Sequence, residues 1–148
     1  VLSTFEGDVV IDADALFALT EAEIDIKPEN SNWTLTPHPG ELKQLTKSED
    51  SRITSAKELS KTVNAVVLSK GLPSVVISPT KQSISTDYDT RIFSRAGFGD
   101  VLAGKIVGYE LITGNRELAC CLALSDGKTK ALNYIIDLEI PLEPLDII

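Results

Sequence analysis

The amino-acid sequence predicts an α/β fold with a mostly parallel sheet and flanking helices. Short β-branched runs alternate with segments of helical periodicity through the first half of the 148-residue chain, as in βαβ units. Apolar residues make up 43% of the sequence, which is enough for the core of one domain. Polar and glycine-rich stretches follow the predicted strands, where open α/β sheets bind ligands.

The chain opens with a predicted strand that ends in acids, "DVVIDAD" over 8–14, and a short helix follows over 15–23. Asp12 and Asp14 alternate along this strand and are expected on one face. Two carboxylates there suit a water-coated Mg²⁺ or a cap for the next helix. The cap is favoured for Asp14, and the role of Asp12 stays open.

The next elements are a strand over 33–36, stopped by Pro37, and two helices over 39–46 and 51–64. Pro39 and Glu41 suit the first turn of the helix over 39–46. The helix over 51–64 places four apolar residues on one face, namely Ile53, Ala56, Leu59 and Val63.

The chain then enters a strand over 65–70, and Gly71 and Pro73 turn it into a hairpin partner over 74–78. A further short strand is predicted over 82–86.

The segment over 100–113 is apolar almost all round, which predicts a buried helix. Gly114 ends this helix, and Asn115 caps a last helix or helix pair over 116–137.

Four marked stretches fall at the ends of these elements. They are the acids at 12–14, "TPHPGE" at 36–41, "SKG" at 69–71 and "GFGD" at 97–100. Because parallel strands end at one edge of a sheet, we expect the four stretches to converge there.

"GFGD" has the composition of an anion-binding site. Gly97 and Gly99 let the backbone approach a ligand, and a helix that starts near Gly99 offers free N–H groups and the positive end of its dipole. Asp100 then lies beside the bound group and can accept a proton from an attacking hydroxyl. A tight turn with a capping aspartate explains the stretch equally well.

His38 lies between two prolines that fix its backbone, and Lys70 ends a strand beside Gly71. The histidine suits recognition of a polar ligand, although an incidental surface histidine is the commoner case. Lys70 can neutralise a phosphate oxygen while Gly71 gives backbone access, or it is a solvated lysine before a turn.

Charge and cysteine content exclude several classes of protein. The net charge of −8 argues against nucleic-acid binding. No apolar run is long enough for a membrane span, and we find no basic-then-apolar pattern of a secretion signal at the start of the sequence. We therefore expect a cytoplasmic protein. Cys120 and Cys121 fit small apolar helix positions, and with the single His38 they are too few for a metal site of their own.

The sequence contains no methionine and begins directly on apolar residues, so we expect it to be part of a longer polypeptide.

Taken in order, "VIDADAL", "LTPHPGE", "SKG" and "GFGDVLAG" resemble the ADP/ATP-dependent NAD(P)H-hydrate dehydratases. The resemblance implies a three-layer, ribokinase-like fold. It also implies that residues 1–148 are the C-terminal part of one nucleotide-binding domain whose N-terminal part is missing.

The resemblance implies repair of NADH-hydrate or NADPH-hydrate, with ADP or ATP as phosphoryl donor and Mg²⁺. The enzyme would phosphorylate the ring hydroxyl and then expel phosphate. Asp100 would deprotonate that hydroxyl, and both Asp100 and His38 would contact the hydrate. The implied nucleotide-binding residues are Lys70, Gly71, Ser74, Gly97 and Gly99. A homo-oligomer is left open, because members of the family often form multimers.

Phe98 departs from the resemblance, because members usually carry a small residue between the two glycines. A phenylalanine removes a hydroxyl donor and brings bulk near the phosphate. Two alternatives therefore stay open: a ribokinase-like kinase for a vitamin or sugar hydroxyl, and a non-catalytic nucleotide-binding module.

Overall fold

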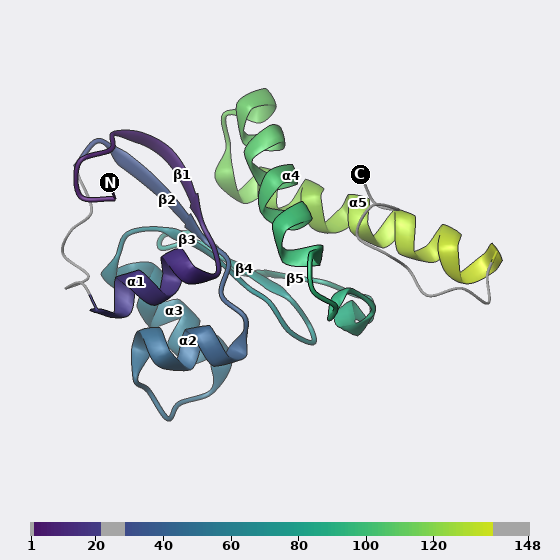
Figure 1. The fold of residues 1–148 in the computed structure, drawn as a ribbon, viewed down its shortest axis with the longest axis horizontal. Coiled ribbons are helices and arrows are strands. Elements are labelled where there is room, and N and C mark those ends of the chain that lie inside the picture. Colours follow the sequence, from purple (N-terminus) through teal and green to yellow (C-terminus); the bar gives the residue numbers. More distant parts are fainter. Residues whose placement is uncertain (1, 22–28, 138–148) are drawn as a thin grey trace.

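The structure is a computed structural model that describes residues 2–21 and 29–137 (Figure 1). Its strands are β1 (Gly7–Ile11), β2 (Ser31–Leu35), β3 (Val66–Ser69), β4 (Val75–Ile77) and β5 (Ile84–Ser85). Its helices are α1 (Asp14–Glu21), α2 (Pro39–Thr46), α3 (Arg52–Thr62), α4 (Phe98–Thr113), α5 (Arg116–Asp137) and a 3₁₀ turn, η2 (Thr90–Phe93). None of the helices in this part of the chain is long and apolar enough to span a membrane.

The strands form one mixed sheet in the order β1-β2-β3-β4-β5. β1, β2 and β3 are parallel, with Ile11 opposite Leu35 and Thr34 opposite Val66. β4 returns antiparallel to β3 and β5 antiparallel to β4, so the expected hairpin and the additional short strand are confirmed. The carboxyl ends of β1, β2 and β3 consequently meet at one edge.

Helices cover both faces of the sheet, as the three-layer prediction requires (Figure 1). α1, α2 and α3 pack on one face, around the completely buried Trp33 and Leu35. α4 and α5 pack on the other, where Ile106 and Cys120 meet Val66. Successive strand residues point to opposite faces, which is why neighbouring apolar residues of β3 belong to different clusters.

Both cysteines are free, and Cys120 is buried in the core formed by α4 and α5. Burial raises the pKa of its thiol, so it is an inert packing residue, as its position in the sequence suggests.

The expectation that 100–113 forms a buried helix was wrong for one of its faces. α4 buries Phe98, Ile106 and Glu110, while Leu111 and Ile112 are more than 80% exposed. The helix covers the sheet with one side only, and no described residue covers the other. When apolar residues lie on every face of a helix, the sequence pattern does not indicate which face packs against the sheet.

Candidate active site

The ends of β1, β2 and β3 converge on Lys70, as the sequence predicts. The Lys70 ammonium lies 2.8 Å from Oδ1 of Asp12, just after β1, and 4.0 Å from Oε2 of Glu41, in α2. The Lys70 backbone N–H donates to the Pro37 carbonyl at 2.9 Å. Because only 22% of the lysine side chain and 13% of the aspartate side chain are exposed, this ion pair is largely shielded from water.

The start of α4 completes the site. Gly97 caps the helix with φ 92°, a conformation that favours glycine, and makes no side-chain cap. A Cβ atom at Gly99 would lie 3.3 Å from Oδ2 of Asp12 and 3.6 Å from Nζ of Lys70. Because glycine has no side chain, the backbone at the start of α4 packs directly against the Asp12–Lys70 ion pair. The first N–H groups of a helix have no intrahelical acceptor, so this end of α4 presents donors beside a lysine.

Asp100 lies in the first turn of α4, next to Gly99. It is exposed, and its carboxylate accepts no hydrogen bond from any residue that the structure describes. The cap position belongs to Gly97, so Asp100 is not the capping aspartate of the predicted alternative; like Asp14 in α1, it is a first-turn acid that complements the helix dipole. Asp100 thus follows Gly99 at the start of α4, with its carboxylate open to solvent.

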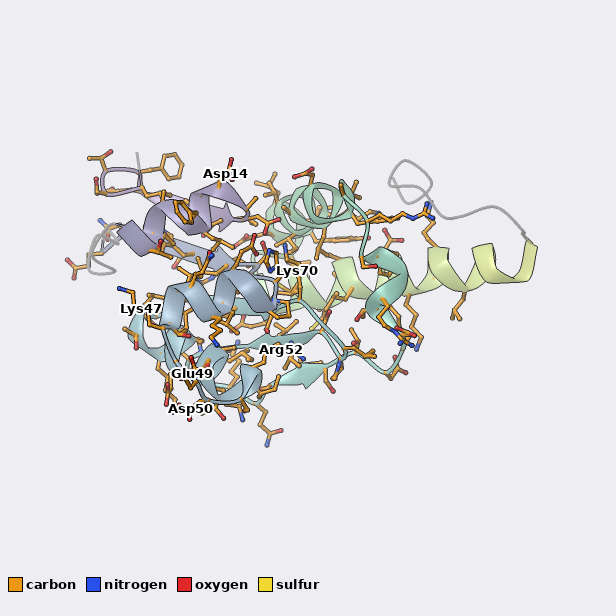
Figure 2. The ribbon with its side chains drawn as sticks, turned by 60° about the horizontal axis from the view of Figure 1, so that its bottom comes forward. Asp14, Lys47, Glu49, Asp50, Arg52 and Lys70 are labelled. Carbon is orange, nitrogen blue, oxygen red and sulfur yellow. The ribbon has the colours of Figure 1, made fainter. Side chains whose placement is uncertain are left out.

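Asp12 and Asp14 do not share a face, contrary to the expectation. β1 ends at Ile11, and Ala13 turns the chain with φ 49°, so Asp12 faces Lys70 while Asp14 begins α1. Asp14 is exposed and lies apart from Lys70 (Figure 2). The expectation that Asp14 caps α1 was wrong, because it is the first residue of the helix, where it complements the dipole as a first-turn acid.

His38 caps α2, a role that the sequence analysis missed. Its Nδ1 accepts from the N–H groups of Gly40 and Glu41 at 3.0 and 3.2 Å, and the Glu41 carboxylate accepts from the His38 N–H at 2.7 Å. This reciprocal pair is a capping box. An acceptor Nδ1 places the proton of a neutral imidazole on Nε2, which lies 3.4 Å from Oε1 of Glu41. The His38 side chain is 56% exposed. Pro39 and Glu41 signalled the helix start, but histidine is an unusual cap.

The turn from Lys70 to Ser74 is tightly bonded internally. Gly71 has φ 144°, and its carbonyl accepts from the Ser74 hydroxyl at 3.0 Å and from the Thr90 hydroxyl. The Ser74 N–H donates to Oγ1 of Thr86 at 3.0 Å. Ser74 is 4% exposed, so its hydroxyl holds the shape of the turn.

Arg52, at the start of α3, supports this turn and carried no signal in the sequence. Its Nη1 donates to the Ser69 carbonyl and hydroxyl at 3.1 and 2.9 Å and to the Lys70 carbonyl at 3.3 Å. Its Nη2 donates to the Pro73 carbonyl at 2.6 Å. Partial burial lowers the pKa of the guanidinium below its ordinary value, which is so high that the group stays charged.

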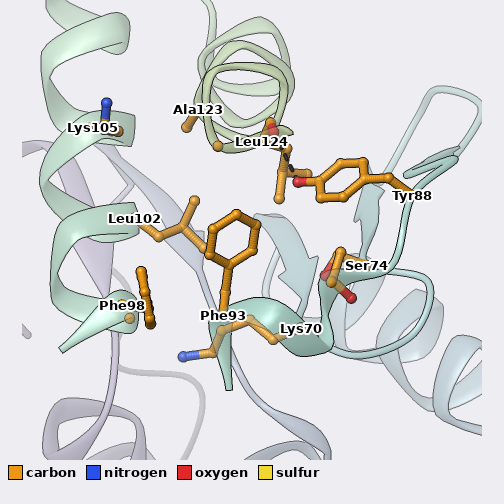
Figure 3. Close-up of a pocket in the computed structure, with 12 residues that line it drawn as sticks. Lys70, Ser74, Tyr88, Phe93, Phe98, Leu102, Lys105, Ala123 and Leu124 are labelled. Carbon is orange, nitrogen blue, oxygen red and sulfur yellow. Dashed lines mark hydrogen bonds between the residues drawn. The ribbon is translucent and has the colours of Figure 1, made fainter. Parts of the chain in front are cut away.

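An apolar pocket opens beside Lys70, between η2, α4 and α5 (Figure 3). The rings of Phe93 and Phe98 meet edge to face at 5.3 Å, and Tyr88 meets Phe93 at 6.3 Å. The Tyr88 hydroxyl donates to the Leu124 carbonyl at 2.8 Å, and burial raises its pKa to about 12. The pocket volume of about 90 Å³ is well below the roughly 300–1,000 Å³ of a cleft that takes a whole ligand. It suits one flat ring system.

Phe98 is 3% exposed and points into this pocket. The Phe98 ring therefore takes up part of the space in the pocket. Phe98 is also the first residue of α4.

The described residues contain no group of three metal-ligating side chains. Mg²⁺ is commonly held by one or two carboxylates together with substrate phosphates. The exposed carboxylate of Asp100, in the first turn of α4, fits that mode.

Comparison with known proteins gives consistent results. A family model described as NAD(P)H-hydrate dehydratase matches residues 1–129. The bifunctional NAD(P)H-hydrate repair enzyme Nnr of Salinibacter ruber is 37% identical over 112 residues, which are 73% of this chain and 21% of that protein. The protein of the same name from Thermanaerovibrio acidaminovorans is 36% identical over 129 residues, 84% of this chain and 25% of that protein.

Two solved structures share the fold. YxkO of Bacillus subtilis, a member of the UPF0031 family and a putative kinase by its description, superposes with a TM-score of 0.84 at 23% identity. It is matched over 99% of this chain and 55% of its own. The ADP/ATP-dependent NAD(P)H-hydrate dehydratase of B. subtilis, crystallised with ATP/Mg²⁺, gives 0.81 at 23% identity, over 95% of this chain and 51% of its own. The chain thus spans about half of these structures and a fifth to a quarter of the curated relatives.

Proposed function

This chain belongs to the NAD(P)H-hydrate dehydratase family, and from that premise we propose that it carries the nucleotide-dependent dehydration of NADH-hydrate or NADPH-hydrate. In this reaction ADP or ATP phosphorylates the hydroxyl of the hydrated nicotinamide ring. Phosphate then leaves, and the dihydronicotinamide is restored. The two steps replace hydroxide, a poor leaving group, with phosphate, a good one.

The contact between the start of α4 and the Asp12–Lys70 pair is the observation that carries this proposal. It brings helix N–H groups and a lysine to one point, with 3.6 Å between Lys70 Nζ and the Cβ position of Gly99. Donors fixed in this way stabilise charge on a phosphoryl group in transfer. We assign Gly97, Gly99, Lys70 and Gly71 to the phosphates of the nucleotide, with Ser74 shaping the turn.

Asp100 is the proposed general base. Its carboxylate is exposed and immediately follows Gly99, so it can take the proton of the ring hydroxyl as that oxygen attacks phosphorus. His38 is the proposed hydrate contact. Glu41 lies 3.4 Å from the His38 ring and 4.0 Å from the Lys70 ammonium, and this link supports a role for His38 beside the phosphates.

We assign the base of the nucleotide to the aromatic pocket. Tyr88, Phe93 and Phe98 offer apolar and edge surfaces to a flat ring, and Lys70 lines the same pocket. Mg²⁺ bound with the nucleotide would neutralise charge on its phosphates. The exposed carboxylate of Asp100 would approach that ion through its water shell and so stay free to act as the base.

We propose that residues 1–148 are the C-terminal part of one nucleotide-binding domain that acts in the cytoplasm. Among the described strands β1 pairs on one side only, and the apolar side chains of Leu111 and Ile112 are exposed on α4. A segment equivalent to the half of the solved structures that this chain does not span would pair with the free edge of β1 and cover the apolar face of α4. The free thiols are in keeping with a reducing compartment.

The test compares wild type with Asp100→Asn in the intact polypeptide, supplied with hydrated NADH, Mg²⁺ and either ADP or ATP. Recovery of NADH absorbance reports turnover, and calorimetry reports nucleotide affinity. We expect the substitution to lower kcat by at least about 100-fold, the lower range for a general base, with nucleotide affinity nearly unchanged. Asp14→Asn, another first-turn acid, serves as the control and should behave as wild type.

Wild type that binds nucleotide and consumes no hydrate would contradict the proposed reaction and favour a non-catalytic nucleotide-binding module. Phosphorylation of a vitamin or sugar in place of the hydrate would favour a ribokinase-like kinase.

A further inference from the structure

We infer that Arg52 is a positioning residue for the nucleotide-binding turn from Lys70 to Ser74. The inference rests on the proposed function, because it concerns the affinity of that turn for the phosphates of ADP or ATP. Arg52 itself acts on the nucleotide only through the backbone that it holds.

Most carbonyl oxygens in and beside the turn accept hydrogen bonds from other side chains. Those of Lys70 and Pro73, together with that of Ser69 just before the turn, all accept from the Arg52 guanidinium, at 2.6 to 3.3 Å. The Gly71 carbonyl is taken by two hydroxyls, those of Ser74 and Thr90. A phosphate is repelled by carbonyl oxygens and attracted by N–H groups and cations. A cation bound to three of these carbonyls therefore removes an electrostatic obstacle to an anion on the turn.

Arg52 also packs closely against Gly71. A Cβ atom at Gly71 would lie 3.0 Å from Cζ and 3.1 Å from Nη1 of Arg52. The guanidinium is thus in direct contact with the backbone of Gly71, which is one of the residues proposed to bind the phosphates. Gly71 is required both by its φ of 144° and by the space that Arg52 occupies.

Arg52 occupies an unfavourable position for a cation in its own helix. It is the first residue of α3, where the helix dipole disfavours a positive charge. Ser51 already caps this end by accepting from the Thr54 N–H at 3.2 Å. The helix gains nothing from an arginine there, so its contacts with the turn are what account for it. Figure 2 shows Arg52 and Lys70 on neighbouring parts of the structure.

A lysine cannot replace this arginine. The planar guanidinium reaches acceptors on Ser69, Lys70 and Pro73 from two nitrogen atoms at once. A single ammonium at the end of a flexible chain cannot span the same acceptors.

The experiment measures the affinity of Mg²⁺–ADP and Mg²⁺–ATP by calorimetry for wild type, Arg52→Lys and Arg52→Gln. We expect both variants to bind about tenfold more weakly, the effect of losing one charge-assisted hydrogen bond. At saturating nucleotide, kcat for hydrate should stay within about threefold of wild type, because the reacting groups are untouched. This separation of KM from kcat is what a positioning role predicts.

Arg116→Gln is the matched control. Arg116 also donates to a backbone carbonyl, that of Trp33 at 3.3 Å. It lies away from the turn: the carboxylate of its neighbour Glu117 accepts from the hydroxyl of Ser78, which follows β4, whereas Ser74 precedes β4. Arg116→Gln should lower Tm without changing nucleotide affinity, which separates a general loss of stability from a loss of positioning.

Arg52→Lys with wild-type affinity would overturn the inference and leave the proposed function standing. Wild type that binds neither nucleotide would instead overturn the proposed function. If both Arg52 variants fail to fold, Ser69→Ala decides. It removes only the hydroxyl acceptor at 2.9 Å, so affinity about twofold weaker supports the inference and unchanged affinity overturns it.

Discussion

Asp12 shows how one side chain can prepare another for its function. Without a partner, the Lys70 ammonium would be destabilised by desolvation beside apolar residues and the start of a helix, and it would have no fixed position. Oδ1 of Asp12 holds the ammonium at 2.8 Å, while Oδ2 faces Gly99. With Glu41 as a more distant second acid, the three side chains carry a net charge of −1 when ionised. Such a site favours a nucleotide that brings Mg²⁺ over the free anion.

Gly99 tests this arrangement against an ordinary helical glycine. We expect Gly99→Ala to weaken nucleotide binding severalfold, because the new methyl group would lie 3.3 Å from Asp12 and disturb its pair with Lys70. Gly104 is also in α4, yet a Cβ there meets nothing within 4 Å. Gly104→Ala should therefore raise the free energy of unfolding by up to about 1 kcal/mol and leave affinity unchanged.

Calorimetry and urea unfolding of the two variants check this prediction. Equal affinities for Gly99→Ala and Gly104→Ala would show that the start of α4 does not hold the nucleotide.

At the scale of elements, α4 carries both the proposed catalytic turn and a buried acid. Glu110 is 7% exposed, and desolvation raises the pKa of its carboxyl above the ordinary value. Asp8 on β1 raises it further and Arg116 on α5 opposes it. The negative charge of Glu110 in turn helps to raise the pKa of the Cys120 thiol on α5.

The raised pKa fixes the sign of the pH dependence. Between the unfolded pKa and the higher folded pKa of Glu110, the folded chain binds more protons than the unfolded chain. Stability therefore falls as pH rises through this window, and the cost of the buried charge is present in full above it. We expect Glu110→Gln to raise Tm by a few degrees at neutral pH and to have little effect below the window.

Thermal unfolding across the acid to neutral range measures this difference. Glu58→Gln on α3, where the residue is exposed, provides the control. A Tm gain for Glu110→Gln that is the same at every pH would contradict the charge argument and point to packing.

Most elements were predictable from sequence because their signals are local. The cap at Asn115, the end of α4 at Gly114 and the apolar face of α3 depend on residues within one or two turns. Lys70 and Asp12 were expected at the same edge because parallel strands force their ends together.

What escaped prediction depends on contacts distant in sequence. Arg52 bonds a turn 17 to 21 residues away, and no periodicity reports such a contact. The outer face of α4 was misjudged because its composition is the same on both sides. His38 was singled out for a ligand contact, and its capping of α2 was missed because histidine rarely occupies that position.

At the scale of the whole molecule, the candidate site exists only when the sheet is assembled. Asp12, Glu41, Lys70 and Gly99 come from the ends of four segments spread over the chain. Unfolding any of the three parallel strands would separate them. Nucleotide binding should therefore stabilise the global fold and not one loop.

We expect Mg²⁺–ADP or Mg²⁺–ATP at a concentration of 100 times Kd to stabilise the folded state by about 2.7 kcal/mol. The gain should be visible as a higher Tm and as slower hydrogen exchange along β1, β2 and β3 together. Lys70→Met should lose the ligand-dependent part of the Tm shift, since it removes the cation beside Gly99. It should also lower Tm without ligand, since Asp12 is left buried without its partner. Protection confined to the turn over 70–74 would mean that the nucleotide binds without the convergence of strands, and would contradict a site built from the whole sheet.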